Sequence, residues 1–293
     1  MNKVLVLGGT MLFGKRLVRQ LIEQGTEVTI ATRGMTPDPF GSSVRRVKLE
    51  RQDRESVVQA LNEGEWDVVY DQTCYSPQEL ADVLELLKGR VGRYVFTSTM
   101  AVYPHGEGLT ESAYDPWQEQ YVLGKPRQAY AGVQGYQEAK RHAEAFLLQQ
   151  TAVPAAAVRF PLVIGPDDYT NRLRFYVDKV KNQTPIALPD PDARLSFISS
   201  EESADFLGWT GRSEWTGPMN ASSEGHISHR ELMKLVESKT GREGGFTDSP
   251  DSPDRSPYGF AGSWTIDASK AAKLGFSFRK LRDYLPELLE SYL

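Results

Sequence analysis

The sequence contains a single cysteine, Cys74, in 293 residues. One cysteine excludes an intrachain disulfide and a zinc site built from several cysteines, and it favours a reducing compartment. Long apolar runs are also missing. The longest candidate, 152–164, contains Pro154, Arg159 and Pro161 and falls short of the roughly 20 residues of a membrane helix. The apolar run at the N-terminus is too short for a signal peptide. We therefore expect a soluble cytoplasmic protein without a membrane partner.

An excess of positive charge is absent as well. The chain has 34 Lys and Arg against 39 Asp and Glu, a net charge of −5. General attraction to phosphate backbones is therefore not expected, which makes nucleic acid an unfavoured partner. Hydrophobic residues make up 40% of the chain, enough to bury a core. The length suggests two domains, or one large domain with an insertion.

Short β-rich runs alternate with helix-periodic segments in the first 160 residues. Ser76, Pro77 and Glu79 form the pattern of a capping box that opens one helix. Another helix is predicted over 133–149. Strands are predicted at 4–7, 28–31, 44–49, 68–70, 94–97 and 155–160. This rhythm is typical of an α/β fold with a doubly wound parallel sheet, the Rossmann arrangement.

The second half of the chain is less regular. Segment 241–262 is rich in Gly, Ser, Pro and Asp, which predicts a long mobile loop, and helices are predicted at 267–274 and 281–293. We predict a Rossmann core over 1–160. A smaller carboxy-terminal α/β lobe, mainly for substrate binding, is predicted over 161–293, with some of its segments returning to the core.

Gly8, Gly9 and Gly14 lie between the first predicted strand and its helix. Backbone N–H groups and the helix dipole at this position favour an anion such as pyrophosphate. The spacing departs from G-x-G-x-x-G, and glycines that only form a tight turn are the alternative. Segment 9–15 also resembles a P-loop, but Arg16 stands where Ser or Thr should hold Mg²⁺, which argues against an NTPase.

The end of the second strand bears on the choice of nucleotide. An Asp or Glu is usual there for NAD, whereas this sequence has Thr32 and Arg33. A hydroxyl and a guanidinium suit a 2′-phosphate, so NADP is favoured and NAD is the alternative. After the third strand, Glu50 is a candidate acceptor for the adenine amino group and Arg51 a candidate to stack on the ring. A solvated strand end is the other interpretation of this pair.

Tyr136 and Lys140 are four residues apart on a predicted helix, so both can face one ligand. An ammonium beside a phenol lowers the phenol pKa, which suits Tyr136 as a general acid and base. Thr99, just after the fifth strand, is placed to meet a substrate oxygen, and Ser98 is an adjacent candidate. Strand-end hydrogen bonding is the alternative role for both hydroxyls.

Together these motifs resemble the extended short-chain dehydrogenase/reductases of the NAD-dependent epimerase/dehydratase family. The resemblance covers nearly the whole chain, because residues 159–166 are similar to the family's sixth strand and turn, and residues 264–276 to its carboxy-terminal signature. Within the family, Gly8-Gly9-Thr10, Thr32-Arg33-Gly34 and residues 165–168 are most similar to bacterial relatives of the chloroplast stem-loop-binding proteins.

The resemblance implies Tyr136 as the acid and base, Lys140 as the residue that binds the nicotinamide ribose, and Thr99 as the partner of the substrate oxygen. Met11 departs from the family pattern, which has a glycine at this position. The resemblance further implies that the cofactor is bordered by Gly8, Gly9, Thr10, Met11, Leu12, Phe13, Gly14, Gln72, Thr73, Thr97, Ser98, Phe160, Pro161, Leu162 and Val163.

Two other sets of side chains are candidate ligand-binding residues. His226 and His229 are three residues apart, but without a third ligand nearby we expect capping and solvation and no metal. Tyr169, Arg172 and Arg174 follow the sixth-strand turn and suit either an anionic substrate or a solvated loop face.

The leading hypothesis is an NAD(P)-dependent oxidoreductase or epimerase-type enzyme. It would act on a hydroxyl or carbonyl carbon of a sugar-like or other small substrate, as a monomer or homodimer. The alternative is a non-catalytic protein on the same fold that binds RNA or senses NADP. The negative net charge disfavours RNA, and retention of Thr99, Tyr136 and Lys140 disfavours both alternatives.

Overall fold

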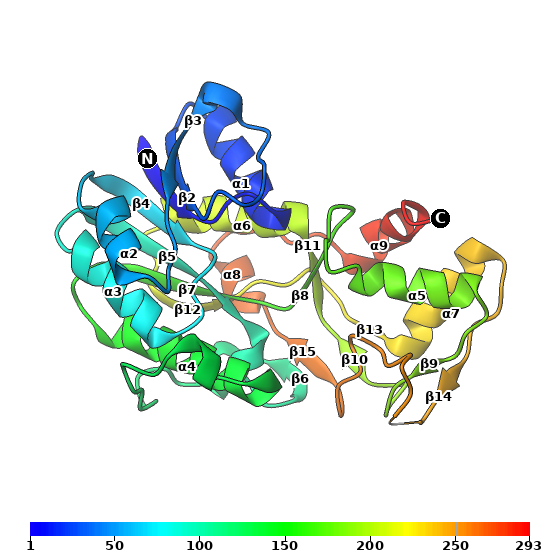
Figure 1. Cartoon of the computed structure of the whole chain (residues 1–293). Helices are drawn as coiled ribbons and strands as arrows, with labels where there is room; N and C mark the ends of the chain where they lie inside the picture. The colour runs from blue at the N-terminus through cyan, green and yellow to red at the C-terminus, as the bar shows by residue number, and fades with distance from the viewer. Residues whose placement is uncertain (250) are drawn as a thin grey trace. The chain divides into compact units, whose positions relative to one another are not determined.

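The computed structural model describes residues 1–249 and 251–293, which form two compact units. Unit 1 comprises Met1–Tyr103, Glu111–Phe160 and Ser203–Asn220. Unit 2 comprises Pro104–Thr110, Pro161–Glu202 and Ala221–Leu293. Each unit is therefore assembled from separate stretches of the chain, as the mixture of colours within each unit in Figure 1 shows.

Unit 1 is organised around a seven-stranded sheet in which every neighbouring pair is parallel. Its spatial order is β12 (Gly217–Asn220), β7 (Ala155–Phe160), β5 (Val91–Thr99), β4 (Trp66–Asp71), β1 (Lys3–Leu7), β2 (Glu27–Thr32) and β3 (Val44–Lys48). The strand order reverses between β1 and β4. In doubly wound sheets, ligands bind outside the carboxyl ends of the strands at such a reversal.

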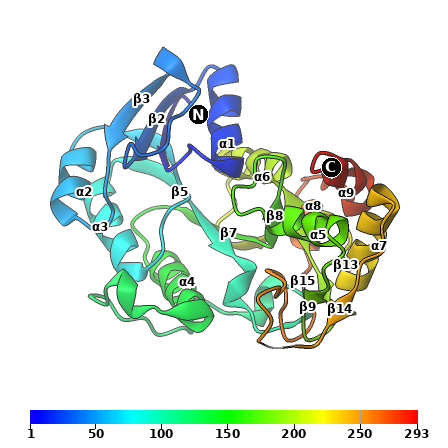
Figure 2. The same ribbon diagram turned by 45° about the vertical axis from the view of Figure 1, so that its right-hand side comes forward.

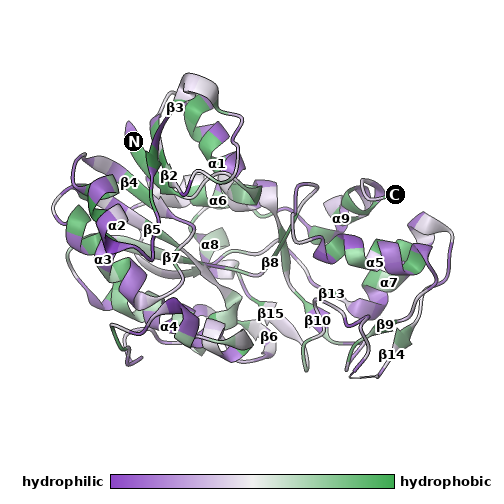
Figure 3. Cartoon of the chain, viewed as in Figure 1, coloured by the Kyte–Doolittle hydropathy of each residue, from purple (hydrophilic) through white to green (hydrophobic). Residues whose placement is uncertain are grey.

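Helices cover both faces of this sheet. Figures 1 and 2 show α1 (Leu12–Glu23) and α6 (Ser200–Arg212) on one face, and α2 (Arg54–Leu61), α3 (Pro77–Leu87) and α4 (Gly132–Gln149) on the other. Figure 3 shows hydrophobic and hydrophilic residues on different sides of these helices. A buried cluster joins the second set of helices to the sheet and includes Val57, Leu61, Leu80, Val83, Ala143 and Leu147 from the helices, and Leu5, Leu7, Val69, Tyr94 and Phe96 from the strands.

Short 3-10 helices and caps fix the connections of unit 1. The Ser76 side chain accepts from the N–H of Glu79 at the start of α3, with Pro77 in the first turn, as the sequence predicts. The Glu79 carboxylate accepts from the N–H of Tyr75, so only half of the expected capping box forms. The 3-10 helices are η1 (Gly41–Ser43), η2 (Met100–Val102), η3 (Glu111–Ala113) and η4 (Arg127–Ala129).

Unit 2 combines short strands with a group of packed helices. A four-stranded sheet has the order β13 (Ile227–Ser228), β10 (Arg194–Leu195), β15 (Trp264–Ile266) and β6 (Gly106–Leu109). Two further pairs are β11 (Phe197–Ser199) with β8 (Leu162–Ile164), and β14 (Phe246–Thr247) with β9 (Ile186–Ala187). Helices α5 (Arg172–Lys181), α7 (His229–Thr240) and α9 (Leu281–Glu290) contact one another, and α8 (Ser269–Lys273) follows β15.

Segment 241–262 is more ordered than the sequence predicts. Its described residues include β14, and Tyr258 has no exposed surface. The Ser256 hydroxyl hydrogen-bonds to the buried Tyr176 of α5 at 2.6 Å, which fixes this part of the segment to the helix. Pro250, which belongs to the predicted loop, lies outside the described residues. Among the described residues, the structure has no helix long and apolar enough to cross a membrane.

Candidate nucleotide and active site

The turn between β1 and α1 contains glycines whose substitution by any larger residue would strain the structure. Gly8 and Gly9 have φ angles of +111° and +90°, in the left-handed region that favours glycine. A Cβ on Gly9 would lie 2.8 Å from Cγ2 of Val18, and a Cβ on Gly14 would lie 2.1 Å from Oε1 of Gln72. The side chain of Gln72, which follows β4, therefore packs directly on the turn.

The N-terminus of α1 has no side-chain hydrogen bond to its cap position within the described part of the chain. Met11 occupies this position with an extended backbone, and the first turn of the helix holds no acidic residue. The first backbone N–H groups of a helix lack intrahelical partners, and the helix dipole adds partial positive charge there. The N-terminus of α1 therefore suits a phosphate or pyrophosphate group.

A cavity of about 350 Å³ within unit 1 opens beside this turn. It is lined by the glycine turn, by the ends of β2 and β3, by Thr73 and by a segment before α4. Its lining comprises Gly8, Thr10, Met11, Ala31, Thr32, Arg33, Gly34, Met35, Thr36, Leu49, Glu50, Arg51, Gln52, Thr73 and Arg127. Eight of these positions are predicted cofactor residues, and six more adjoin them at the ends of β2 and β3. Arg127 is not expected from the sequence, since it lies in an irregular segment far along the chain.

Arg33 provides a cation at this cavity that is available to a ligand. Its side chain is exposed and makes no hydrogen bond or ion pair with the residues that the structure describes. The hydroxyl of Thr32 accepts from the N–H of Gly34 at 3.1 Å and keeps its own proton to donate. Glu50 is half-buried at the same cavity. Thr32, Arg33 and Glu50, which the sequence analysis assigns to a nucleotide, therefore line the same cavity.

Arg51 is used differently from the stacking role expected of it. Only 6% of its surface is exposed, and its Nη2 donates to Oδ2 of Asp71 at 2.8 Å, while Nη1 donates to the same carboxylate and to Oγ1 of Thr73 at 3.1 Å. Burial alone would raise the pKa of Asp71, but the Arg51 guanidinium outweighs it and holds the pKa below its usual value. Arg51 is therefore an internal ion-pair partner, and neither a stacking platform nor a solvated strand end.

The ion pair of Arg51 and Asp71 is part of a longer network. Nε of Arg51 lies 3.6 Å from the Glu79 carboxylate, which also accepts from Nε and Nη2 of Arg127 at 2.6 and 2.7 Å. The hydroxyl of Tyr94 donates to Asp71. Two cations and two carboxylates therefore balance one another from the end of β3 to the segment before α4.

Tyr136 and Lys140 lie on α4, near the carboxyl ends of β4 and β5. Nζ of Lys140 donates to the carbonyl of Cys74 at 3.1 Å and to the carbonyl of Thr97 at 2.7 Å. Burial lowers the pKa of the Lys140 ammonium. Tyr136 is half-buried, and its ring centroid lies 5.6 Å from that of Tyr75. The two predicted catalytic side chains therefore contact neighbouring residues of the same short segment.

The hydroxyls after β5 have separate roles. Oγ1 of Thr99, which is half-buried, accepts from the N–H of Ala101 and caps η2, so its proton is available to another acceptor. The hydroxyl of Ser98 is buried and donates to Oε2 of Glu144 at 2.6 Å. The Ser98 hydroxyl is therefore committed to the core, in contrast to its expected place beside a cofactor. Oγ1 of Thr97 is buried without a hydrogen-bond partner among the described residues.

Glu144 also joins α4 to the sheet through a buried ion pair with Arg159, in which both side chains have 0% exposure. Nη1 of Arg159 donates to the Tyr103 hydroxyl at 2.7 Å, which in turn donates to Oδ1 of Asn220 at 2.7 Å. This chain of polar contacts connects α4, β7, the end of η2 and β12. It holds the helix that carries Tyr136 and Lys140 against the sheet.

The remaining expected residues divide between the units. Leu12 is buried at the start of α1, and the ring of Phe13 lies 5.5 Å from that of Phe160 at the end of β7. Pro161 belongs to unit 2, as do Leu162 and Val163, which form part of β8. Of these residues, Phe160 packs near the glycine turn within unit 1, through its contact with Phe13.

Comparison with known proteins identifies the family. A model of the NAD dependent epimerase/dehydratase family matches residues 4–210. The chain belongs to this family. Residues 4–210 contain the glycine turn, the cavity and the pair Tyr136 and Lys140, so the geometry described above lies within the matched region.

Two curated relatives illustrate the range of this family. The chain is 27% identical over 267 residues to the chloroplast stem-loop binding protein of 41 kDa b of Arabidopsis thaliana, a match that covers 84% of this chain and 64% of that protein. It is 30% identical over 124 residues to 2'-dehydrokanamycin reductase of Streptomyces kanamyceticus, covering 42% of this chain and 35% of that protein. This chain therefore spans less than two thirds of the length of either relative.

Solved structures share the fold of this family member. The UDP-glucose 4-epimerase of Thermus thermophilus, solved in complex with NAD, has a TM-score of 0.71 at 18% identity. That match covers 99% of this chain and 98% of the epimerase. At this level of identity the likeness establishes the doubly wound fold.

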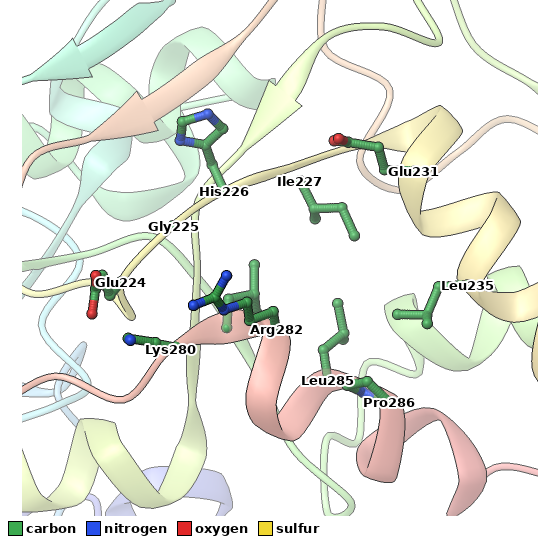
Figure 4. A pocket seen from close by; sticks show the side chains of 11 residues that line it. Glu224, Gly225, His226, Ile227, Glu231, Leu235, Lys280, Arg282, Leu285 and Pro286 are labelled. Atoms are coloured by element: carbon green, nitrogen blue, oxygen red, sulfur yellow. The ribbon is translucent and has the colours of Figure 1, made fainter.

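Unit 2 of this family member contains a separate cavity of about 450 Å³. Its lining, shown in Figure 4, combines the apolar side chains of Ile227, Leu235 and Leu285 with charged side chains that include Glu231 and Arg282. None of these residues belongs to the predicted cofactor or catalytic set.

The two histidines of unit 2 have different partners. His226 contacts Nη1 of Arg194 at 2.6 Å. His229 is fully buried, and its Nδ1 lies 2.7 Å from the Tyr176 hydroxyl. No metal-binding group of His, Cys, Asp and Glu occurs among the residues that the structure describes. His226 is exposed and pairs with Arg194, whereas His229 is a core residue, so the expected solvation of His229 is wrong.

The candidate anion-binding residues of unit 2 are also engaged. Arg172 donates to the Thr170 hydroxyl at 2.9 Å, and Arg174 forms an ion pair with Asp178 at 3.7 Å. Tyr169 is exposed. Arg172 and Arg174 therefore lie on the first turn of α5, each with a polar partner close by in the sequence.

Proposed function

We propose that this chain binds NADP, or less favourably NAD, in the cavity of unit 1, and that it catalyses hydride transfer at a hydroxyl or carbonyl carbon of a small, sugar-like substrate. The observation that carries the proposal is the cavity itself, which joins a tight glycine turn and an uncapped α1 to the ends of β2 and β3. The NAD complex of the Thermus epimerase and the reductase relative support the same cofactor class.

The residues present fit a dinucleotide. The glycine turn leaves room where a Cβ at Gly8 would lie 2.9 Å from Thr73, and the start of α1 offers N–H groups to pyrophosphate. Arg33 and Thr32 would bind a ribose 2′-phosphate, and Glu50 would accept from adenine. When bound, the dinucleotide supplies the hydride acceptor or donor.

The remaining steps belong to side chains of α4 and β5. Tyr136 would move the proton of the reacting hydroxyl or carbonyl oxygen, and Thr99 would donate to that oxygen from its hydroxyl. Lys140, held by two carbonyls, would keep a positive charge near the phenol and favour its ionised form. Its remaining N–H would bind a ribose hydroxyl.

Thermal unfolding tests the proposal directly. The protein is heated alone and with NADP⁺, NAD⁺, ATP with Mg²⁺, or a short RNA hairpin. A ligand at 100 times its Kd stabilises the folded state by about 2.7 kcal/mol, which raises Tm measurably. We expect NADP⁺ to raise Tm most and ATP to leave it unchanged. Unchanged Tm with both dinucleotides would overturn the proposal.

The Arabidopsis relative favours a second candidate function, the binding of a nucleic-acid stem-loop, since its name states that activity. The net charge of −5 provides no general attraction to phosphates. A Tm response to the hairpin that disappears steeply with added salt would support this candidate. Dinucleotide binding without turnover on a panel of carbonyls and sugars would instead support an NADP sensor.

A further inference from the structure

Tyr75 contacts the start of α4 at two points. Its ring packs on Tyr136 with a centroid distance of 5.6 Å and an angle of 52° between the planes. Its hydroxyl donates to the carbonyl of Tyr130 at 3.3 Å, just before the helix begins. The preceding carbonyl, that of Cys74, accepts from Lys140. Two adjacent residues after β4 therefore hold both α4 side chains of the proposed active site.

The start of α4 needs such support because its own sequence provides little. Ala131 at the cap position makes no side-chain hydrogen bond within the described residues, and Gly132 has a φ of +65°. Glycine at this point loses more backbone freedom on folding than another residue would. Tyr136 lies only one turn further on. Contacts from outside the helix are therefore required to fix its position.

Tyr75 is itself held by charged groups. Its N–H donates to Oε2 of Glu79 at 3.1 Å, and the Arg127 guanidinium lies 4.9 Å from the centre of its ring. Glu79 is 5% exposed and accepts two hydrogen bonds from Arg127. Such a cation over an aromatic ring attracts it and restricts its orientation. Arg127 also lines the nucleotide cavity.

We propose that Tyr75 is the positioning residue for Tyr136, and that Arg127 connects occupation of the nucleotide cavity to the orientation of this tyrosine pair. A ligand in the cavity meets Arg127, Arg127 restrains the Tyr75 ring, and the ring sets where the Tyr136 phenol points. The inference rests on the proposed function, because a fixed phenol matters only if it moves a proton.

The experiment follows the ionisation of Tyr136 and needs no substrate. Tyrosinate absorbance is titrated with pH in each variant and in the same variant carrying Tyr136→Phe, and the difference gives the Tyr136 midpoint. The variants are Tyr75→Leu, Tyr75→Phe and Arg127→Gln. Tyr121→Leu is the matched control, because Tyr121 also packs its ring on α4, against Phe146 at 5.5 Å, without contacting Tyr136 in the described structure.

We expect Tyr75→Leu to move the Tyr136 midpoint by about half a pH unit or more, because the phenol gains water and loses its fixed relation to Lys140. Tyr75→Phe and Arg127→Gln should move it less, in the same direction. Added NADP⁺ should change the midpoint in the wild type and less in Arg127→Gln. Tyr121→Leu should leave the midpoint unchanged.

A Tyr136 midpoint that is the same in Tyr75→Leu, Tyr121→Leu and the wild type would overturn the inference. If Tyr75→Leu does not fold, unchanged midpoints in both Tyr75→Phe and Arg127→Gln would overturn it equally. Dinucleotide binding is measured separately by calorimetry. Its absence in the wild type would remove the proposed function, while the titration without ligand would still decide whether Tyr75 positions Tyr136.

Discussion

The Nζ atom of Lys140 lies 2.7 Å from the carbonyl oxygen of Thr97, so the backbone at the end of β5 holds the ammonium of α4. The Cys74 carbonyl, in the segment after the neighbouring strand β4, accepts a second hydrogen bond. Two carbonyls stabilise the charged form of a buried ammonium, which burial alone would disfavour. The position of Lys140 is therefore determined by the sheet and not by its helix alone.

Replacing Tyr136 with Phe should remove turnover while leaving dinucleotide affinity within a few-fold. Loss of a general acid and base costs about 10²- to 10⁴-fold in rate, and the phenol hydroxyl is not part of the cavity lining. The measurement is the rate of dinucleotide reduction or oxidation on a substrate found by screening, together with calorimetry. Full activity in this variant would contradict the proposed mechanism.

Arg33→Ala should lower NADP⁺ affinity about tenfold or more and leave NAD⁺ affinity unchanged. A hydrogen bond to a charged group contributes about 1.5–3 kcal/mol, and only NADP⁺ carries the 2′-phosphate. Arg45→Ala is the matched control, since Arg45 is exposed on β3 but does not line the cavity. Equal losses for both dinucleotides would show that Arg33 does not select between them.

Asp71→Asn should lower the free energy of unfolding by about 3 kcal/mol or more. The change leaves the buried charge of Arg51 with only the Glu79 carboxylate, 3.6 Å from its Nε, and breaking a buried ion pair typically costs this much. Urea unfolding measures the effect. Asp192→Asn, in an exposed pair with Arg230, should have little effect, and similar losses in both variants would contradict a special role for the buried pair.

His229 should make the protein less stable in acid. Burial lowers its pKa to about 4 from an unfolded value near 6.5, so between these values only the unfolded chain takes up the proton. The contribution of His229 to the free energy of unfolding is therefore complete above pH 6.5. It decreases as the pH falls to about 4, by about 3 kcal/mol in all. Asp190 opposes the shift without cancelling it.

The check on His229 is urea unfolding at several pH values in the wild type, His229→Gln and His226→Gln. The difference in stability between wild type and His229→Gln should depend on pH within this window. His226 is exposed, so its variant should follow the wild type. Parallel pH curves for wild type and His229→Gln would refute the prediction.

Local sequence predicts the part of the fold that depends on local patterns. The apolar run of β1, the glycine turn and the helical spacing of Tyr136 and Lys140 each lie within a few residues, and the doubly wound sheet is confirmed. Strand β12 is different. It has four residues, one of them Pro218, and forms only because β7 offers an edge to it.

The charged residues of the site also depend on contacts that local sequence patterns do not predict. Arg51 follows β3 as an exposed strand end would, and only the structure brings Asp71, twenty positions later, against it. Arg127 follows Pro126 in a segment with no periodic pattern, yet it lines the cavity and pairs with Glu79. Contacts between distant, irregular segments carry no local signal, so sequence patterns did not reveal these partners.

The interleaving of the two units constrains how this protein can change over generations. A gene shortened after Phe160 would lose the Ser203–Asn220 stretch and leave the backbone of β7 as an open edge, where other chains can pair and aggregate. Exchange of either unit for another would require several simultaneous cuts and joins. Exchange of a whole unit is therefore less accessible to this chain than a substitution or an insertion within a loop.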